Sequence, residues 1–404
     1  MQSNRSAPQS APATLSLALP VALAAQTFTA AAMFAPSVLA PAASADMGVP
    51  ATAVGMMTSL IFLSAAFAAP QIGSRVPQLG ALRVTQIGLC LVACGMALAA
   101  LAHPLLVLLA AMVIGVGYGP STPSGSALLA ERTPPRIFNF IMSIRQTGVP
   151  LGGALAGFAL PWLILYVGWR AAALVLAAAC AVVALCLQPV RARFDHTDRV
   201  DRAKATTARP GMVEALRMVL AHPALRRLSL TAFLYGGVQL TYASFMVVFL
   251  VEQAAMDVVR AGAVLSAGML GGLIGRLAWG ALADALGDAR KVLIALGMVT
   301  AACAALFTQI TAQWPYAGVL IPAIVFGACT LGWNGVYIAE LAREAPKGTV
   351  AQATGASLAF AYCGAVVVPP LFALVQVSSG SYAPAFAMLA VLAAAGVVSL
   401  ARRV

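Results

Sequence analysis

The feature that most limits this chain is a series of twelve apolar runs, each long enough to cross a membrane. A helix needs about 20 apolar residues to span the hydrocarbon core of a bilayer. It also satisfies its backbone polar groups within itself, which an open sheet or a loop in lipid cannot do. We therefore predict an all-α integral membrane protein with twelve transmembrane helices. The predicted spans are residues 15–36, 49–69, 82–102, 104–129, 137–165, 168–188, 228–251, 259–283, 291–311, 314–339, 350–377 and 382–400.

The composition agrees with this class and excludes a soluble domain. Hydrophobic residues make up 61% of the chain, charged residues make up 9%, and the mean hydropathy is +0.93. The net charge is +12, but the basic residues lie in short segments between the apolar runs, so we expect no nucleic-acid partner. The first run, with Arg5 before it and SADM after it, also resembles a signal peptide, although its greater length favours a retained span.

The basic residues predict the orientation of the chain, because Lys and Arg are enriched in cytoplasmic loops. If both termini are cytoplasmic, only Arg170 and Arg260 of the 24 Lys and Arg residues fall in outer loops, while Arg145 and Arg276 fall inside spans. We expect a multi-pass protein in a bacterial-type inner (plasma) membrane, in contact with membrane lipid, with both termini cytoplasmic.

One long polar stretch divides the chain. It predicts an N-terminal six-helix bundle at 1–188, a cytoplasmic linker at 189–227 and a C-terminal six-helix bundle at 228–404. Within the linker, the apolar residues of 211–220 recur at helical spacing, which predicts a short amphipathic helix on the membrane surface.

The loop between predicted spans eight and nine carries the most specific motif, GRLAWGALADALGDARK at 275–291. Gly280 permits two helices to approach closely, Gly287 permits a tight turn with positive φ, and Asp284 can accept bonds from a helix N-terminus or an arginine. Arg290 stands in a basic position at the end of the motif. With the twelve spans, the six-plus-six division and the basic central loop, this motif resembles the loop signature of the major facilitator superfamily over nearly the whole chain.

The resemblance implies two pseudo-symmetric bundles, transport by alternating access, and a gate. The gating residues would be Gly280, Asp284, Gly287 and Arg290, which would clasp the cytoplasmic side closed in the outward-facing state. The family's Arg after the Asp is Ala285 here, and the equivalent loop at 70–83 has no acid, so we expect a one-sided clasp. The alternative is a short soluble turn without a gating role.

A second resemblance lies in span five, where GVPLGG at 148–153 is similar to the Gly- and Pro-rich signature of drug and metabolite antiporters. Its small residues allow close packing, and Pro150 frees a backbone carbonyl inside the helix. This resemblance implies export or exchange. In span four, IGVGYG at 114–119 keeps the family's glycines, but Ala111 stands where the family often has Arg, which argues against arginine-assisted proton transfer.

Polar residues deep within spans are the candidate solute ligands. Gln239 and Tyr242 share a face of span seven, as Asn334 and Tyr337 do in span ten. By resemblance, spans two, five, eight and eleven line the interface between the bundles, which puts both buried arginines on cavity-lining helices. The predicted solute-binding residues are Gln26, Asn139, Arg145, Gln146, Gln239, Tyr242, Arg276, Trp333, Asn334, Tyr337 and Tyr362.

Arg145 raises the question of its counter-charge, because a charge at the bilayer centre costs at least about 2.5 to 3.5 kcal/mol. It lies about nine residues past the cytoplasmic loop, roughly 13 Å along a helix. None of the twelve acids falls in the middle of a span, and Glu131 and Glu340 lie at span ends. We therefore expect an anionic solute as the counter-charge. A bracing role for Arg145 and for Arg276 remains the alternative.

We predict a secondary active transporter that moves a small organic solute, preferably an anion, by antiport or export, with H+ or a counter-solute as coupling partner. We expect a monomer without a cofactor. The first alternative is proton-coupled efflux of hydrophobic drug-like compounds through Glu131 or Glu340. The second, from another class, is a non-transporting membrane sensor. We expect no enzyme activity, because the sequence offers no buried set of Ser, His and Asp for catalysis. We expect no metal site at Cys90 and Cys94, because no His or second Cys pair accompanies them.

Overall fold

The computed structural model describes residues 11–73, 76–130, 132–134, 138–195, 212–346 and 350–401. The regular structure of these residues is helical. The elements are α1 (Ala11–Met47), η1 (Ala51–Ala53), α2 (Val54–Gly73), α3 (Val76–Leu79), α4 (Ala81–Ala99), α5 (Pro104–Tyr118), α6 (Ser121–Ala130), α7 (Phe138–Gln146), α8 (Gly148–Cys186), α9 (Gln188–Asp195), α11 (Met212–Ala221), α12 (Pro223–Glu252), α13 (Val258–Leu286), α14 (Ala289–Phe307), α15 (Tyr316–Glu344), α16 (Val350–Ser379) and α17 (Tyr382–Ala401).

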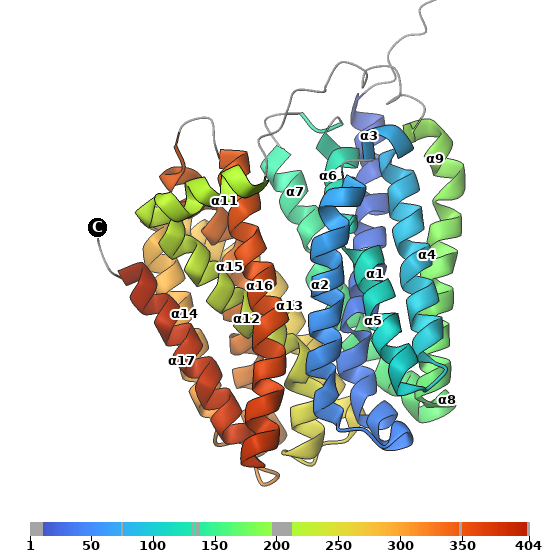
Figure 1. Cartoon of the computed structure of the whole chain (residues 1–404), viewed down its shortest axis with the longest axis vertical. Coiled ribbons are helices and arrows are strands. Elements are labelled where there is room, and N and C mark those ends of the chain that lie inside the picture. Colours follow the sequence, from blue (N-terminus) through green and yellow to red (C-terminus); the bar gives the residue numbers. More distant parts are fainter. Residues whose placement is uncertain are drawn as a thin grey trace, which may run out of the picture.

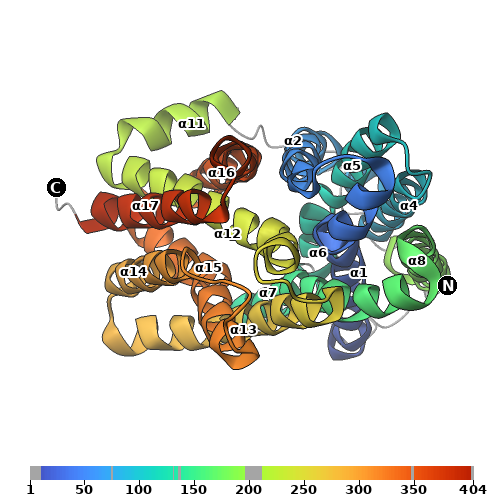
Figure 2. The same cartoon turned by 90° about the horizontal axis from the view of Figure 1, so that it is seen from below.

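The helices form two groups that stand side by side (Figures 1 and 2). The first group holds α1 to α9 and the second holds α11 to α17, with α7, α12 and α13 near the centre of the view along the helices. We call the end where α3, α7, α9 and α11 lie the basic end, because the connections, short helices and helix ends there carry basic residues such as Arg132, Arg191, Arg290 and Arg343. The opposite end is called the far end.

The number of membrane-spanning helices differs from the sequence prediction for one reason. In the described part of the chain, eleven helical segments are long and apolar enough to cross a membrane. One of them, Ile144–Arg191, has 48 residues, which at about 1.5 Å per residue is roughly 70 Å and more than twice the hydrocarbon core. It contains the predicted spans 137–165 and 168–188 except for the first few residues.

The chain reverses direction inside α8 at Gly168. This residue has φ 80° and ψ 163°, whereas the residues around it are helical. That conformation is essentially restricted to glycine, because a Cβ atom would clash with the backbone. Next to the turn, Trp169 Nε1 and Arg170 Nη2 donate to the Asp46 carboxylate at 3.1 and 2.8 Å, which ties the turn to the end of α1. Because the ion pair is exposed, solvent screens it and it contributes little to stability.

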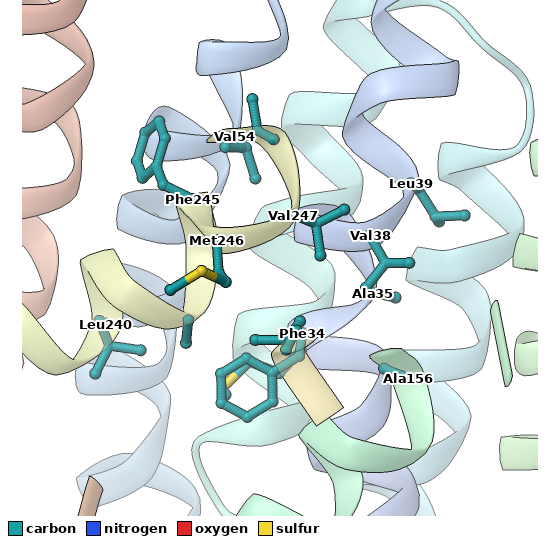
Figure 3. Close-up of a cluster of buried hydrophobic side chains, with 14 of the residues drawn as sticks. Phe34, Ala35, Val38, Leu39, Val54, Ala156, Leu240, Phe245, Met246 and Val247 are labelled. Carbon is teal, nitrogen blue, oxygen red and sulfur yellow. The ribbon is translucent and has the colours of Figure 1, made fainter. Parts of the chain in front are cut away.

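The two groups share one apolar core near the far end. Figure 3 shows Phe34, Val38 and Leu39 of α1 beside Met246 and Val247 of α12. Thr58 and Ser244, one from each group, form a buried hydrogen bond of 2.7 Å in the same region. The groups therefore pack tightly at the far end, where they exclude water.

Small residues bring α8 and α13 into close contact. A Cβ added to Gly157 would lie 2.6 Å from Ser266 Oγ, and one added to Gly262 would lie 2.3 Å from the Gly157 carbonyl oxygen. Ser266 Oγ also donates to the Ala154 carbonyl at 2.8 Å. The glycines of the GVPLGG motif also pack closely: a Cβ on Gly152 would lie 2.3 Å from the Thr27 carbonyl oxygen of α1, and one on Gly153 would lie 2.8 Å from Met269 Sδ of α13. These contacts confirm the sequence prediction that the small residues of this motif allow close packing against a neighbour.

The linker prediction is confirmed in its helical part. The helix α11 occupies 212–221, close to the predicted 211–220, and it packs against α12 and α16 at the basic end (Figure 1). Glu131, Arg75 and Lys347 lie outside the described residues.

We predict that Gly168→Ala destabilises the protein by about 1 to 3 kcal/mol, because alanine at this φ and ψ is strained. Gly355→Ala is the matched control, since its added Cβ would meet no atom within 4 Å, and we expect it to be neutral or to stabilise by up to about 1 kcal/mol. Thermal unfolding of both purified variants measures the difference. Equal melting temperatures would contradict the assigned turn.

Candidate functional site

Arg145 lies in the last turn of α7 and is buried, with 2% of its surface exposed. Its Nη1 donates to Gln26 Oε1 of α1 at 3.1 Å, and Gln26 Nε2 lies 3.5 Å from Ser121 Oγ of α6. A Cβ on Gly125 would lie 3.1 Å from Arg145 Nη1, so this glycine makes room for the guanidinium. The buried Nε of Arg145 has no hydrogen-bond partner.

No ion pair neutralises Arg145 within the described residues. Glutamine provides one hydrogen bond but no charge. A buried cation without a counter-charge is costly by several kcal/mol. The guanidinium therefore keeps an unused donor and an uncompensated charge, which together favour the binding of an anion.

Two tyrosines, one from each group of helices, lie within electrostatic range of this arginine. The ring of Phe62 in α2 lies 6.0 Å from Tyr118 of α5 and 6.2 Å from Tyr362 of α16. Tyr118 interacts electrostatically with both Arg145 and Arg276. Because Tyr362 belongs to the second group, the cluster lies at the interface between the groups.

Arg276 of α13 approaches the same region from the second group. Its Nε donates to the Leu331 carbonyl of α15 at 3.0 Å, and its Nη1 donates to the Gln146 carbonyl of α7 at 3.1 Å. Two backbone carbonyls as partners favour the bracing role that the sequence left open for this residue. The Gln146 side chain is half-buried beside Arg145.

Gln239, on the predicted polar face of span seven, contacts Asn334, on the predicted polar face of span ten. Gln239 Oε1 of α12 accepts from Trp333 Nε1 at 2.9 Å and from Asn334 Nδ2 at 3.3 Å, both of α15. Trp333 is buried, while Gln239 and Asn334 are half-buried. This polar triad links the two helices within the second group.

Two predicted site residues are buried elsewhere. Tyr242 donates to the Ala323 carbonyl at 2.9 Å and packs against Phe326 with ring centroids 4.8 Å apart. Tyr337 is 1% exposed and packs against Trp333. Neighbouring helices cover both side chains almost completely in this conformation, and their solute-binding role stays a prediction. The side chain of Asn139 lies outside the described residues.

The loop between α13 and α14, which carries the predicted gating residues, matches the sequence predictions in part. Gly287 ends α13 with φ 64°, which confirms the predicted turn with positive φ. A Cβ on Gly280 would meet no atom within 4 Å, so the prediction of close helix packing at Gly280 is wrong here. The Asp284 side chain is exposed and has no partner among the described residues. Arg290 Nε donates to the Leu400 carbonyl of α17 at 2.7 Å. Asp284 therefore makes no clasp contact among the described residues, and the gating role of this loop stays a prediction.

Tyr118, Ser121 and Gly125 are site residues that the sequence analysis missed. Tyr118 lies within the IGVGYG motif, where the glycines drew the interpretation, and Ser121 and Gly125 lie in the STPSG segment that follows. The sequence could have pointed to these residues, because this segment is the most polar part of predicted span four.

A cavity of about 150 Å³ lies away from this cluster, in the first group near the far end. Pro36, Leu39, Met47, Met57 and Met96 are among the residues that line it. It has no charged side chain in its wall and could not hold an anion. In the described part of the chain, no group of three His, Cys, Asp or Glu residues is placed to bind a metal ion.

Comparison with known proteins adds a family and several relatives. Residues 22–369 match the family model for the Major Facilitator Superfamily. A gallate transporter of Pseudomonas putida is 25% identical over 287 residues, which cover 64% of this chain and 64% of that protein. An uncharacterised MFS-type transporter of Mycobacterium tuberculosis is 25% identical over 331 residues, which cover 80% of this chain and 71% of that protein. The chain thus spans less than two thirds of the gallate transporter's length.

Solved structures share the fold at low sequence identity. A variant of the nucleoside transporter NupG has a TM-score of 0.74 at 15% identity and covers 95% of this chain and 98% of its own. A bacterial homologue of the human lysosomal transporter Spinster, inward-facing and unoccupied, has a TM-score of 0.68 at 18% identity. The match covers 96% of this chain and 95% of that chain. At these identities the likeness establishes the fold alone.

We predict a pH dependence from Asp288, which caps α14 by accepting from the Lys291 backbone N–H at 3.0 Å. This hydrogen bond holds the pKa of Asp288 below its ordinary value of 3.8. The cap is therefore complete above that value and is lost as the pH falls through the lowered pKa of the folded chain.

Asp288→Ala should destabilise by about 0.5 to 2 kcal/mol near neutral pH. Asp288→Asn is the control, because asparagine also caps helices but does not titrate there. Melting curves between about pH 3 and pH 6 test this, and an equal acid response of wild type and Asp288→Asn would exclude the cap as its source.

Proposed function

Because the chain belongs to the Major Facilitator Superfamily and is a multi-pass membrane transporter, we propose that it carries a small organic anion by alternating access. One observation carries the proposal: Arg145 is buried at the interface with an unpartnered Nε and without an ion pair among the described residues. The chain would move this solute without transforming it.

The free donor of Arg145 suits a carboxylate. Its Nη1 is used by Gln26, so the Nε edge of the guanidinium is the one left for a ligand. Arginine presents N–H groups in a planar fork that matches two carboxylate oxygens. A bound carboxylate would supply both the missing hydrogen bond and the missing negative charge.

The aromatic side chains beside Arg145 favour a solute with a ring. Phe62, Tyr118 and Tyr362 offer ring faces and hydroxyl groups from both groups of helices. Gallate, which the relative from Pseudomonas putida is named for, is an aromatic carboxylate. We therefore propose small aromatic carboxylates as the first substrates to test.

The direction of opening follows from charge and packing. By the positive-inside rule the basic end faces the cytoplasm, and the apolar core near the far end closes the outer side. We propose that residues 1–188 and 228–404 move as two bodies, and that this conformation is the one that opens inward. The GVPLGG motif supports exchange or export as the direction.

A second candidate function rests on Glu340. This residue of α15 is 2% exposed, pairs with Arg343 at 2.8 Å and has a buried Oε2 without a partner. Such a carboxylate could exchange a proton, as proton-coupled efflux of a hydrophobic compound requires. If this candidate is right, a pH gradient drives transport in the wild type and not in Glu340→Gln.

We predict that Arg145→Lys weakens binding of an aromatic carboxylate about 10- to 100-fold, because a charge-assisted hydrogen bond contributes about 1.5 to 3 kcal/mol. Arg145→Gln should abolish binding while the protein still folds. Calorimetric titration of the purified protein with gallate and benzoate, followed by uptake into proteoliposomes, measures this.

Arg170→Gln is the matched control, since it removes one positive charge from an exposed arginine far from the site. It should bind the carboxylates as the wild type does. Normal affinity in Arg145→Gln would exclude this arginine as the solute ligand and leave it a bracing role.

We further predict that Asp284→Asn shifts the population toward the conformation with an open basic end. The carboxylate has no partner among the residues that the structure describes, so we expect its loss to destabilise a conformation in which the clasp forms. Spin labels at the exposed residues Leu79 of α3 and Leu220 of α11 report the opening as a distance distribution. An unchanged distribution would remove the clasp from the transport cycle.

A further inference from the structure

Prolines in the interface helices leave backbone carbonyls without their usual partner. A proline has no N–H, so the carbonyl four residues before it receives no hydrogen bond within the helix. Gln146 ends α7, and Pro150, four residues later in the first turn of α8, has no N–H to offer its carbonyl; Pro370 inside α16 leaves the Val366 carbonyl free. In lipid or in a dry interface such a carbonyl needs another donor.

The other group of helices provides the donor for the Gln146 carbonyl. Arg276 Nη1 of α13 donates to it at 3.1 Å, while Arg276 Nε holds the Leu331 carbonyl of α15 at 3.0 Å. Arg276 thus joins its own group to the broken point between α7 and α8. Arg145, the proposed solute ligand, is the residue next to Gln146.

A second bond across the interface has the opposite direction, with the donor in the first group and the free carbonyl in the second. Ser59 Oγ of α2, in the first group, donates to the Val366 carbonyl of α16, in the second group. Each group therefore contributes one helix with a free carbonyl and one helix with the donor that satisfies it. Both bonds are made by side chains at the point where the groups meet.

The two bonds lie at different depths. Arg276 is ten residues from the end of α13 at the basic end, and Ser59 is five residues from the start of α2 at the far end. Among the inter-group hydrogen bonds formed by Thr58, Ser59, Ser266 and Arg276, the bond of Arg276 lies nearest to the basic end.

We propose that these two bonds are opposing latches: the bond from Arg276 to the Gln146 carbonyl limits opening at the basic end, and the bond from Ser59 to the Val366 carbonyl limits opening at the far end. Arg276 is then a positioning residue that transmits a change at Arg145 to the second group. The inference rests on the proposed alternating access for its role in transport, and on the hydrogen bonds for its existence.

The carbonyls make the latches reversible. A carbonyl that is satisfied in its own helix would gain little from a partner across the interface. A carbonyl that proline leaves free has no partner when the groups separate, until water reaches it. It therefore favours forming the bond across the interface again when the groups approach. Restoring an N–H at position 150 should therefore weaken the latch without touching Arg276.

A double-mutant cycle of Pro150→Ala and Arg276→Met tests this coupling. The reporters are the spin labels at Leu79 and Leu220, in a chain whose exposed cysteines Cys90, Cys94, Cys186 and Cys363 have been replaced. We expect each single variant to raise the ratio of wide to narrow distances at least about threefold, and the double variant to add nothing to the larger effect. Unchanged ratios, or effects that multiply, would overturn the latch.

Two further variants sharpen the result. Pro322→Ala removes a proline inside α15, away from these two bonds, and should leave the distances unchanged. Ser59→Ala should lower the wide population, because it weakens the opposing latch. A shift in the same direction as Arg276→Met would overturn the opposition between the two bonds.

Arg276→Lys guards against a variant that simply fails to fold. Lysine keeps the charge but is a point donor without the planar fork that holds two carbonyls at once, so we expect a smaller rise in the ratio than in Arg276→Met. The distances are measured without solute. A failed cycle therefore removes the latches and leaves the Arg145 proposal standing, while normal solute affinity in Arg145→Gln removes the solute site alone.

Discussion

The hydrogen-bonding requirement of backbone groups inside a membrane is the constraint on which this structure depends. It makes each crossing a helix, and it gives special weight to every helix proline. At Gln146 and Val366 the missing bond is supplied across the interface, by Arg276 and Ser59. The positions at which the helices are locally weakest are thus the positions at which the two groups hold each other.

The charge distribution of the interface is the second organising feature. Two arginines, one from each group, interact electrostatically with Tyr118, and the described part of the chain gives neither an ion pair. Repulsion between like charges in a poorly solvated region favours separation of the groups, whereas an anion between them would favour approach. A bound anion and an empty site therefore favour different distances between the groups, which is the differential affinity that a ligand needs to shift a conformational equilibrium.

Much of the fold could be predicted from the sequence, because lipid solvation imposes length and apolarity on each span. The turn at Gly287 was also predictable, since local geometry determines it, and helical spacing assigned Gln239 and Asn334 to candidate polar faces. The contact of Arg145 with Gln26 and the burial of Tyr242 were not. They depend on the depth and rotation of one helix against another, which residues far apart in sequence settle jointly through packing.

The turn at Gly168 has a consequence for how the chain enters the membrane. Spans five and six meet within one continuous helical element, with one glycine and no polar loop between them. A first crossing made alone would end at this glycine, with Trp169 and Arg170, which already belong to the second crossing, as its boundary residues. The two crossings should therefore insert together as a helical hairpin, so that biosynthesis treats this pair as a single topological unit.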